Sequence, residues 1–234
     1  MDYTFEHPLV PGTLIKRYKR FLADVEMDDG TVITAHCANT GSMSGCSTPG
    51  SRVHLSRSSN PKRKLAYSLE LVEVEGSTVG VNTALPNRIV ENALQRGVVP
   101  ELAVYKGYRR EVRYAEKSRI DLLLEQEGLP PCYVEVKNVT MEDQGKALFP
   151  DAVTERGKRH LNDMLAQVEQ GDRAAMVYLI QRTDCTSFSP ADEVDPHYGE
   201  ALRRALKGGV MAFALVATPT TEGIQVTHQV PVSL

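Results

Sequence analysis

The stretch from Arg119 to Asn138 constrains the fold of this chain more strongly than any other part of it. Two runs rich in branched apolar residues, 119–124 and 132–138, lie on either side of a polar segment with Gly128 near its middle. Apolar runs joined by a short connection that contains Gly and Pro predict a β-hairpin. Apart from Arg119 at the start of the first run, three charged residues lie within these strands: Asp121, Glu135 and Lys137.

The position of the turn predicts how the two strands pair. With the turn centred on Gly128, Asp121 lies directly opposite Glu135. The same register places Ile120 and Leu122 on one uniformly apolar face, which a slip of one residue would destroy. Directly opposed Cβ atoms lie about 4.5–5.5 Å apart, so we expect the two carboxylates to be neighbours.

Neighbouring carboxylates repel each other, and a positive partner is needed to keep both ionised. A divalent cation supplies that partner, and Mg²⁺ suits few hard oxygen ligands because it retains water and takes phosphate oxygens. Such an ion lowers the pKa of a bound water and polarises a phosphoryl group. Lys137 could orient the attacking water or stabilise the developing charge. We therefore predict that Asp121 and Glu135 bind Mg²⁺ or Mn²⁺ in a site for phosphodiester hydrolysis.

The alternative interpretation is a solvent-exposed hairpin face on which the same three charges form salt bridges. The apolar residues beside the carboxylates, Leu122–Leu124 and Tyr133, favour a functional site, because charged side chains rarely lie near a core unless they are paired or functional. Glycosidases also use two carboxylates, but this chain has no Trp to stack on a sugar ring. A glycosidase is therefore the weaker hypothesis.

Two further segments offer groups to this site. Glu155 and Arg156 open a long helix predicted over 154–170, and we interpret them as additional catalytic groups, with Arg156 binding a phosphate. Alternatively, Glu155 only interacts favourably with the helix dipole and Arg156 is solvated. Glu91, on a helix predicted over 86–95, is a candidate third metal ligand or else an ordinary surface residue.

Residues 1–82 have the pattern of an all-β domain. β-rich segments such as 31–37 and 67–74 alternate with turn sequences, of which Asp28–Gly30 is the strongest hairpin signal. Five short strands in this part of the chain favour a small closed barrel of the OB type. Barrels of this type often bind nucleic acid, although many do not.

The pattern changes at residue 83, where helical and strand segments begin to alternate. After the helix over 86–95 we expect three strands, the helix over 154–170, an apolar strand over 173–181, a helix over 196–207 and two late strands. This order is typical of a mixed sheet flanked by helices. The predicted fold is therefore α/β (α+β overall), with an OB-like barrel over 1–82 and a layered α/β domain over 83–234.

The net charge of −3 does not by itself indicate a nucleic-acid partner, but the basic residues are clustered. Local clusters attract a phosphate backbone whatever the net charge is. The turn at Asn39–Thr40 could add backbone N–H groups that meet a phosphate. The alternative is that these charges are solvated loop tips. The predicted DNA-binding residues are Lys16, Arg17, Lys19, Arg20, Lys62, Arg63, Lys64, Asn39 and Thr40.

Long segments of this sequence resemble the sugar fermentation stimulation protein (SfsA) family along nearly the full chain. The spacing of Asp121, Glu135 and Lys137 also resembles the PD-(D/E)xK nuclease core, although Ile120 stands where that motif usually has Pro or a small residue. The segments that carry the family resemblance are Leu14–Val25, His36–Met43, Ser118–Asp121, Tyr133–Lys137 and Phe149–Gly157.

The resemblance implies an OB-like N-terminal domain, a PD-(D/E)xK nuclease-like C-terminal domain, and DNA binding mainly through the phosphate backbone. It also implies a regulatory link to sugar (maltose) utilisation in bacteria. Two functions remain open at this point. One is a Mg²⁺- or Mn²⁺-dependent DNA nuclease, and the other is a non-catalytic DNA-binding regulator with little sequence preference.

Several classes of protein are disfavoured. The sequence has no apolar run of membrane-spanning length and no signal-peptide pattern at its start. Its four cysteines form no CxxC pair, so we expect neither disulfides nor a zinc site, and we expect a cytoplasmic protein. No GxSxG or P-loop pattern is present, and we expect no organic cofactor. The sequence leaves the oligomeric state open.

Overall fold

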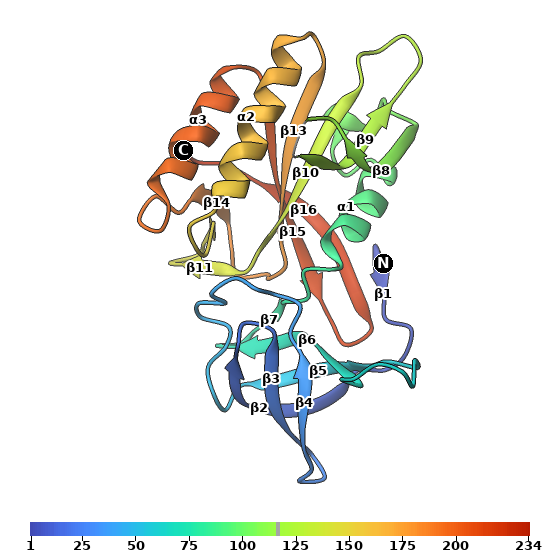
Figure 1. Cartoon of the computed structure of the whole chain (residues 1–234), viewed down its shortest axis with the longest axis vertical. Helices are drawn as coiled ribbons and strands as arrows, with labels where there is room; N and C mark the ends of the chain where they lie inside the picture. Colours follow the sequence, from blue (N-terminus) through green and yellow to red (C-terminus); the bar gives the residue numbers. More distant parts are fainter. Residues whose placement is uncertain (116–117) are drawn as a thin grey trace.

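The computed structural model describes residues 1–115 and 118–234. Two domains are stacked along the longest axis of the molecule (Figure 1), with a β-barrel at the bottom and a larger sheet with three helices above it. Among the described residues, no helix combines the length and apolar character needed to cross a membrane. This architecture confirms the predicted order of an OB-like barrel followed by a mixed α/β domain.

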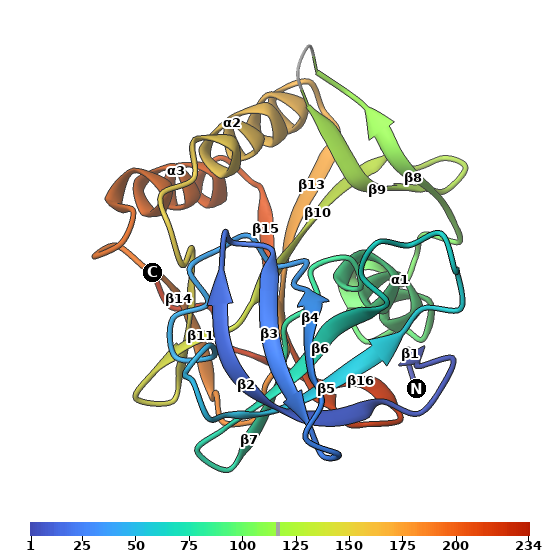
Figure 2. The same cartoon turned by 60° about the horizontal axis from the view of Figure 1, so that its bottom comes forward.

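The barrel is built from a six-stranded sheet in the order β4-β3-β2-β5-β6-β7, which closes through a parallel pairing of His36 on β4 with Ser68 on β6. Alternate side chains point inward, so Leu14, Val25 and Leu55 are buried. Figure 2, with the bottom of the molecule turned forward, shows these strands wrapping around one another. The strands are β2 (Val10–Tyr18), β3 (Leu22–Met27), β4 (Val32–His36), β5 (Arg52–Arg57), β6 (Tyr67–Val74) and β7 (Ser77–Gly80).

The larger sheet has seven strands in the order β1-β16-β15-β13-β10-β9-β8. Its three central strands, β10, β13 and β15, are parallel, and the outer pairs are antiparallel. The strands are β1 (Tyr3–Thr4), β8 (Gly107–Arg113), β9 (Arg119–Glu125), β10 (Cys132–Val139), β13 (Arg173–Ile180), β15 (Met211–Pro219) and β16 (Gly223–Val230).

Helices cover both faces of this sheet. Helix α1 (Pro86–Gln95) packs on one face, and α2 (Glu155–Glu169) and α3 (Pro196–Lys207) pack on the other (Figure 1). Strand β13 lies between two layers of helices, which explains its continuous apolar sequence. The three helices begin and end close to their predicted residues. Thr154 and Asp195 cap α2 and α3 by accepting hydrogen bonds from backbone N–H groups of the first turn.

Some elements of the structure were not predicted. Strand β1 pairs with β16, so the first residues belong to the larger sheet and the assignment of residue 1 onward to the barrel is wrong. A small sheet formed by β11, β12 and β14 and a short 3₁₀ helix were also missed, because these segments are short and β14 pairs with the distant β12. Their bounds are Met141–Asp143, Lys146–Phe149, Ser187–Pro190 and Pro100–Leu102.

The predicted hairpin is confirmed, and its register is confirmed for the three pairs nearest the turn. The last of these pairs is Leu122 with Val134, as expected from a turn centred on Gly128, and the pairing ends there, one residue before Asp121 and Glu135. The prediction that Ile120 and Leu122 share one apolar face is wrong. Ile120 packs in the core under α2 and α3, whereas Leu122 packs in the core under α1. The alternation breaks at Asp121, whose side chain turns back toward the neighbouring strand.

Candidate active site

A cavity of about 400 Å³ lies where the barrel meets the larger domain. Its walls come from the loop after β4, the start of α1, strands β9 and β10, the small sheet, and the start of α2. Segments that are far apart in sequence therefore form one concave site. The predicted residues that line it are Asn39, Thr40, Asp121, Glu135, Lys137 and Arg156.

The carboxylate of Asp121 is held on both oxygens. Its Oδ2 accepts a hydrogen bond of 2.7 Å from the backbone N–H of Val136, and its Oδ1 accepts one of 2.8 Å from the side-chain amide of Asn87 on α1. Burial, and then the charge of Glu135, raise the pKa of Asp121 to about 6. Asp121 and Glu135 are thus close enough for their charges to oppose each other.

Glu135 is 2% exposed and uses only one of its two carboxylate oxygens within the protein. Oε1 accepts hydrogen bonds of 2.5 Å from both Lys137 Nζ and His160 Nδ1. Oε2 is buried and has no hydrogen-bond partner. Burial works to raise the pKa of Glu135, but Lys137 and His160 outweigh it, so the pKa is lowered and the carboxylate is ionised.

His160, on α2, fixes the orientation of Glu135. The imidazole is 1% exposed, and its Nδ1 contacts Glu135 while its Nε2 accepts a hydrogen bond of 3.4 Å from Arg156 Nε. A neutral imidazole with the proton on Nδ1 satisfies both contacts, since it donates on one nitrogen and accepts on the other. Arg156, one helical turn before His160, brings its guanidinium to the wall of the cavity.

The residues present fit a divalent cation. An ionised, buried oxygen without a partner costs free energy, and a cation beside Glu135 Oε2 would remove that cost. The same charge would offset the repulsion between Asp121 and Glu135. Within residues 1–115 and 118–234 no cluster of three or more His, Cys, Asp or Glu side chains is arranged to hold a metal. Mg²⁺ and Mn²⁺ suit such a sparse carboxylate site, because Mg²⁺ is commonly held by one or two carboxylates together with water and phosphate oxygens.

Two predicted residues do not reach the cavity. Glu91 is buried on α1, where its carboxylate accepts hydrogen bonds from Tyr108 and from both Nε and Nη2 of Arg110. Glu155 is exposed and pairs with Lys158 in the same helix. Neither lines the cavity, so we leave Glu91 out of the metal site and Glu155 out of the catalytic group.

The predicted DNA-binding residues fall into two separate places. Arg17 and Arg20 lie beside the cavity, because both donate hydrogen bonds to backbone oxygens of the loop after β4. Lys16 is exposed on β2 and lies 3.6 Å from Asp24, and Lys19 is exposed at the turn. The exposed cluster Lys62–Lys64 lies in the connection between β5 and β6 and does not line the cavity.

The turn at Asn39–Thr40 is followed by backbone N–H groups that are used within the protein. The N–H of Gly41 is used by the side chain of Asn39 at 2.8 Å, and the N–H of Met43 is used by Asp151 at 3.0 Å. These two donors are therefore satisfied within the protein and are not available to a phosphate. The contact of a phosphate with Asn39 and Thr40 stays a prediction. Asn39 and Thr40 line the cavity all the same.

Sequence reasoning gave no role to several residues that build the site. His160 and Asn87 hold the two carboxylates, and Asp151 and Asn138 line the cavity. One signal for His160 was available in the sequence. It lies four residues after Arg156, so the two side chains share one face of the predicted helix. The other contacts join distant segments, so nothing in the local pattern could identify them.

Family models match both domains of the chain. The model described as the SfsA N-terminal OB domain matches residues 15–81, and that described as the sugar fermentation stimulation protein RE domain matches residues 84–223. The sugar fermentation stimulation protein homolog of Geobacter sulfurreducens is 55% identical over 225 residues, which is 96% of this chain and 96% of that protein. The chain belongs to the SfsA family.

Other members of the SfsA family agree with this assignment. The homolog from Rhodospirillum centenum is 54% identical over 230 residues and covers 98% of this chain and 99% of its own length. Among solved structures, that of Pyrococcus furiosus SfsA in complex with Ca²⁺ has a TM-score of 0.89 at 26% identity, covering 99% of this chain and 98% of that one. The predicted family and the two predicted folds are confirmed.

Proposed function

We propose that this SfsA-family protein is a Mg²⁺- or Mn²⁺-dependent nuclease that hydrolyses phosphodiester bonds in DNA. The observation that carries the proposal is the buried, ionised and unpartnered Oε2 of Glu135, which lies next to a second carboxylate and two cationic side chains in one cavity. Strongly perturbed titratable groups in a cleft are typical of catalytic sites.

Asp121 and Glu135 would hold the metal, which when bound would activate water and polarise a phosphoryl oxygen. The protein's own groups provide the remaining functions. Lys137 and Arg156 line the same cavity and can donate to non-bridging phosphate oxygens as charge develops on them. His160 keeps Oε1 of Glu135 occupied and so leaves Oε2 free for the metal.

The relative from Pyrococcus furiosus supports a divalent cation in this chain, since that protein was solved with Ca²⁺ and shares the fold over nearly the full length. Ca²⁺ binds hard oxygen ligands, as Mg²⁺ does, but tolerates a different geometry. The four free and buried cysteines are in keeping with action in the cytoplasm, where thiols stay reduced.

DNA would approach from the side where Arg20 contacts the loop that lines the cavity, with Lys16 and Lys19 exposed on the same strand and its turn. These exposed cations supply affinity for the phosphate backbone without sequence readout. Binding should therefore weaken steeply with salt. A member of the family without catalytic activity would keep this surface, so a DNA-binding regulator of sugar metabolism remains the alternative function if cleavage is absent.

The test is incubation of labelled single- and double-stranded DNA with Mg²⁺ or Mn²⁺, comparing the wild type with Lys137→Ala. Lys158→Ala is a matched control, because Lys158 pairs with the exposed Glu155 outside the cavity. We expect cleavage by the wild type and the control, and a loss of about 10²–10³-fold in Lys137→Ala. Equal cleavage by Lys137→Ala, or no cleavage of any substrate, would contradict the proposal.

A further inference from the structure

Residues 38–43, here called the cavity loop, form the barrel's side of the cavity. Arg17 donates hydrogen bonds of 2.8–3.3 Å to backbone oxygens of Asn39, Gly41 and Ser42 in this loop. Arg20 donates one of 2.8 Å to another of its backbone oxygens. Charged donors on backbone oxygens make strong hydrogen bonds, so the loop is held firmly to the barrel.

The cavity loop is also fixed to the larger domain. Asp151 accepts a hydrogen bond of 3.0 Å from the N–H of Met43, and Thr83 donates one of 3.0 Å to the backbone oxygen of Ala38. Gly41 lies so close to Asp151 that a Cβ atom would overlap the carboxylate. Both domains thus hold the loop in place across the cavity that contains Glu135.

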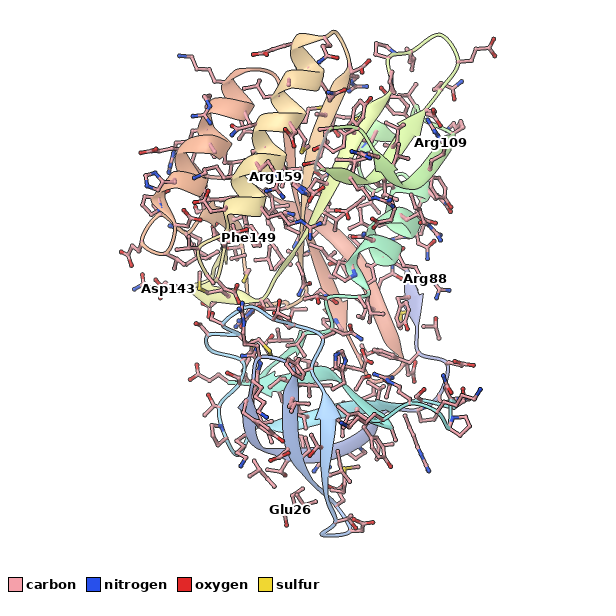
Figure 3. All side chains as sticks on the ribbon, viewed as in Figure 1. Glu26, Arg88, Arg109, Asp143, Phe149 and Arg159 are labelled. Carbon is pink, nitrogen blue, oxygen red and sulfur yellow. The ribbon has the colours of Figure 1, made fainter. Side chains whose placement is uncertain are left out.

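The size and lining of the cavity limit what can enter it. A volume of about 400 Å³ is near the lower end of the roughly 300–1,000 Å³ typical of sites for one small molecule. Lys137 and Arg156 provide positive charge, and Asn138, whose side-chain oxygen accepts a hydrogen bond from Gln181, also lines the cavity. Phe149, which Figure 3 places beside the first turn of α2, adds an aromatic ring.

These features match a single nucleotide unit. Cationic side chains suit its phosphate. Phe149, whose ring also packs against Tyr178 and Tyr198, offers an aromatic edge of the cavity on which a base can pack. The two strands of a duplex could not enter a cavity of this size together. A single strand can present one nucleotide at a time once its bases are unpaired.

We propose that the substrate of this site is single-stranded DNA, one nucleotide of which enters the cavity, and that the cavity loop excludes duplex DNA from the carboxylates. This inference rests on the proposed nuclease function for the identity of the reaction. It adds the strandedness of the substrate and assigns the cavity loop as the element that selects it.

The experiment compares one labelled oligonucleotide as a single strand and as a blunt duplex. Cleavage is measured with the wild type in Mn²⁺, and binding is measured by fluorescence anisotropy with Glu135→Gln in EDTA at fixed salt, so that no strand is cut. We expect the single strand to be favoured at least about tenfold in both assays, in line with the free energy of stacking one base. Equal or better binding and cleavage of the duplex would overturn the inference.

Two variants separate the cavity loop from general charge. Arg17→Ala and Lys16→Ala each remove one positive charge from the same part of β2, but only Arg17 contacts the cavity loop. Arg17→Ala should bring the ratio of single strand to duplex close to one, whereas Lys16→Ala should weaken both substrates and leave the ratio unchanged. Arg20→Ala, which removes one exposed contact with the loop, should change the ratio less and in the same direction.

The outcomes distinguish this inference from the proposed function. A single-strand preference in binding without cleavage of either substrate would contradict the nuclease function and leave the inference standing. Cleavage of both substrates at equal rates would support the nuclease function and contradict the inference. An unchanged ratio in a folded Arg17→Ala protein would show that the cavity loop does not select the strand.

Discussion

Two buried glutamates on neighbouring elements differ in how many of their carboxylate oxygens accept hydrogen bonds within the protein. Glu91 on α1 is 4% exposed, and both of its oxygens accept hydrogen bonds, from Tyr108 and from Arg110. Glu135 on β10 is 2% exposed, but one of its oxygens has no partner. The first carboxylate is fully used within the protein, and the second keeps an oxygen available. Glu91 also lies outside the cavity that Asp121 and Glu135 line, so under the proposed function Glu91 stabilises the fold and Glu135 binds the metal.

The largest expected effect is on cleavage by Glu135→Gln. The substitution removes the charge that would hold the metal while its amide oxygen can still accept from Lys137 and His160. We expect cleavage to fall by about 10³-fold, with the free energy of unfolding of the metal-free protein changed by less than about 1 kcal/mol. Gel assays of cleavage and chemical denaturation in EDTA measure the two quantities. A marked loss of stability with normal cleavage would reverse the assignment.

The opposite pattern is expected for Glu91→Ala. This substitution leaves the hydroxyl of Tyr108 and the guanidinium of Arg110 without their acceptor. The free energy of unfolding should fall by roughly 3 kcal/mol, while cleavage below the melting temperature should stay within about twofold of the wild type. Loss of metal binding in a folded Glu91→Ala protein would restore Glu91 as a ligand.

A smaller effect is expected at His160, which acts by positioning Glu135. His160→Ala should lower the affinity for Mn²⁺ and the rate of cleavage by about 10–100-fold, as loss of an outer hydrogen bond to a ligand does. His160→Gln can still donate a hydrogen bond and should recover part of this loss. If both variants lose stability but bind Mn²⁺ like the wild type, His160 has a structural role only.

The smallest effect concerns pH and Asp121 in the metal-free protein. Burial and the charge of Glu135 raise the pKa of this carboxyl to about 6, above its value in the unfolded chain. The folded state therefore holds the proton more tightly, and the contribution of Asp121 to stability falls as pH rises from about 4 to about 6. The side chain of Asp121→Asn cannot ionise, so the stability of this variant does not fall over this pH range. It should therefore be more stable than the wild type by about 1–2 kcal/mol at pH 8. Equal stability in EDTA at pH 8 would contradict the raised pKa.

Local sequence signals were enough to predict the elements that carry the site. Turn chemistry at Gly128 gave the hairpin and its register, and Pro86 and Gly171 marked one end each of α1 and α2. The cavity itself could not be predicted, because it forms only when the loop after β4 meets the larger domain through Asp151. Periodicity assigns a side chain to one face of a strand, but it does not show which residues of other elements cover that face.

The same limit explains the error at Glu91. Its place on the polar side of α1 was predicted from helical spacing, and a surface position or a metal site followed from that. The structure instead buries Glu91 against Tyr108 and Arg110 of β8, a strand that begins after the intervening 3₁₀ helix. Pairing between a helix and a distant strand depends on tertiary packing, which residue spacing does not contain.

The most direct test of the central claim is a titration of the metal-free protein with Mn²⁺, followed by thermal unfolding. A ligand that binds only the folded state raises the melting temperature. The wild type and Glu91→Gln should both show this rise, and Asp121→Asn and Glu135→Gln should not. A rise of equal size in all four proteins, or no rise in the wild type, would contradict a metal site built on Asp121 and the free oxygen of Glu135.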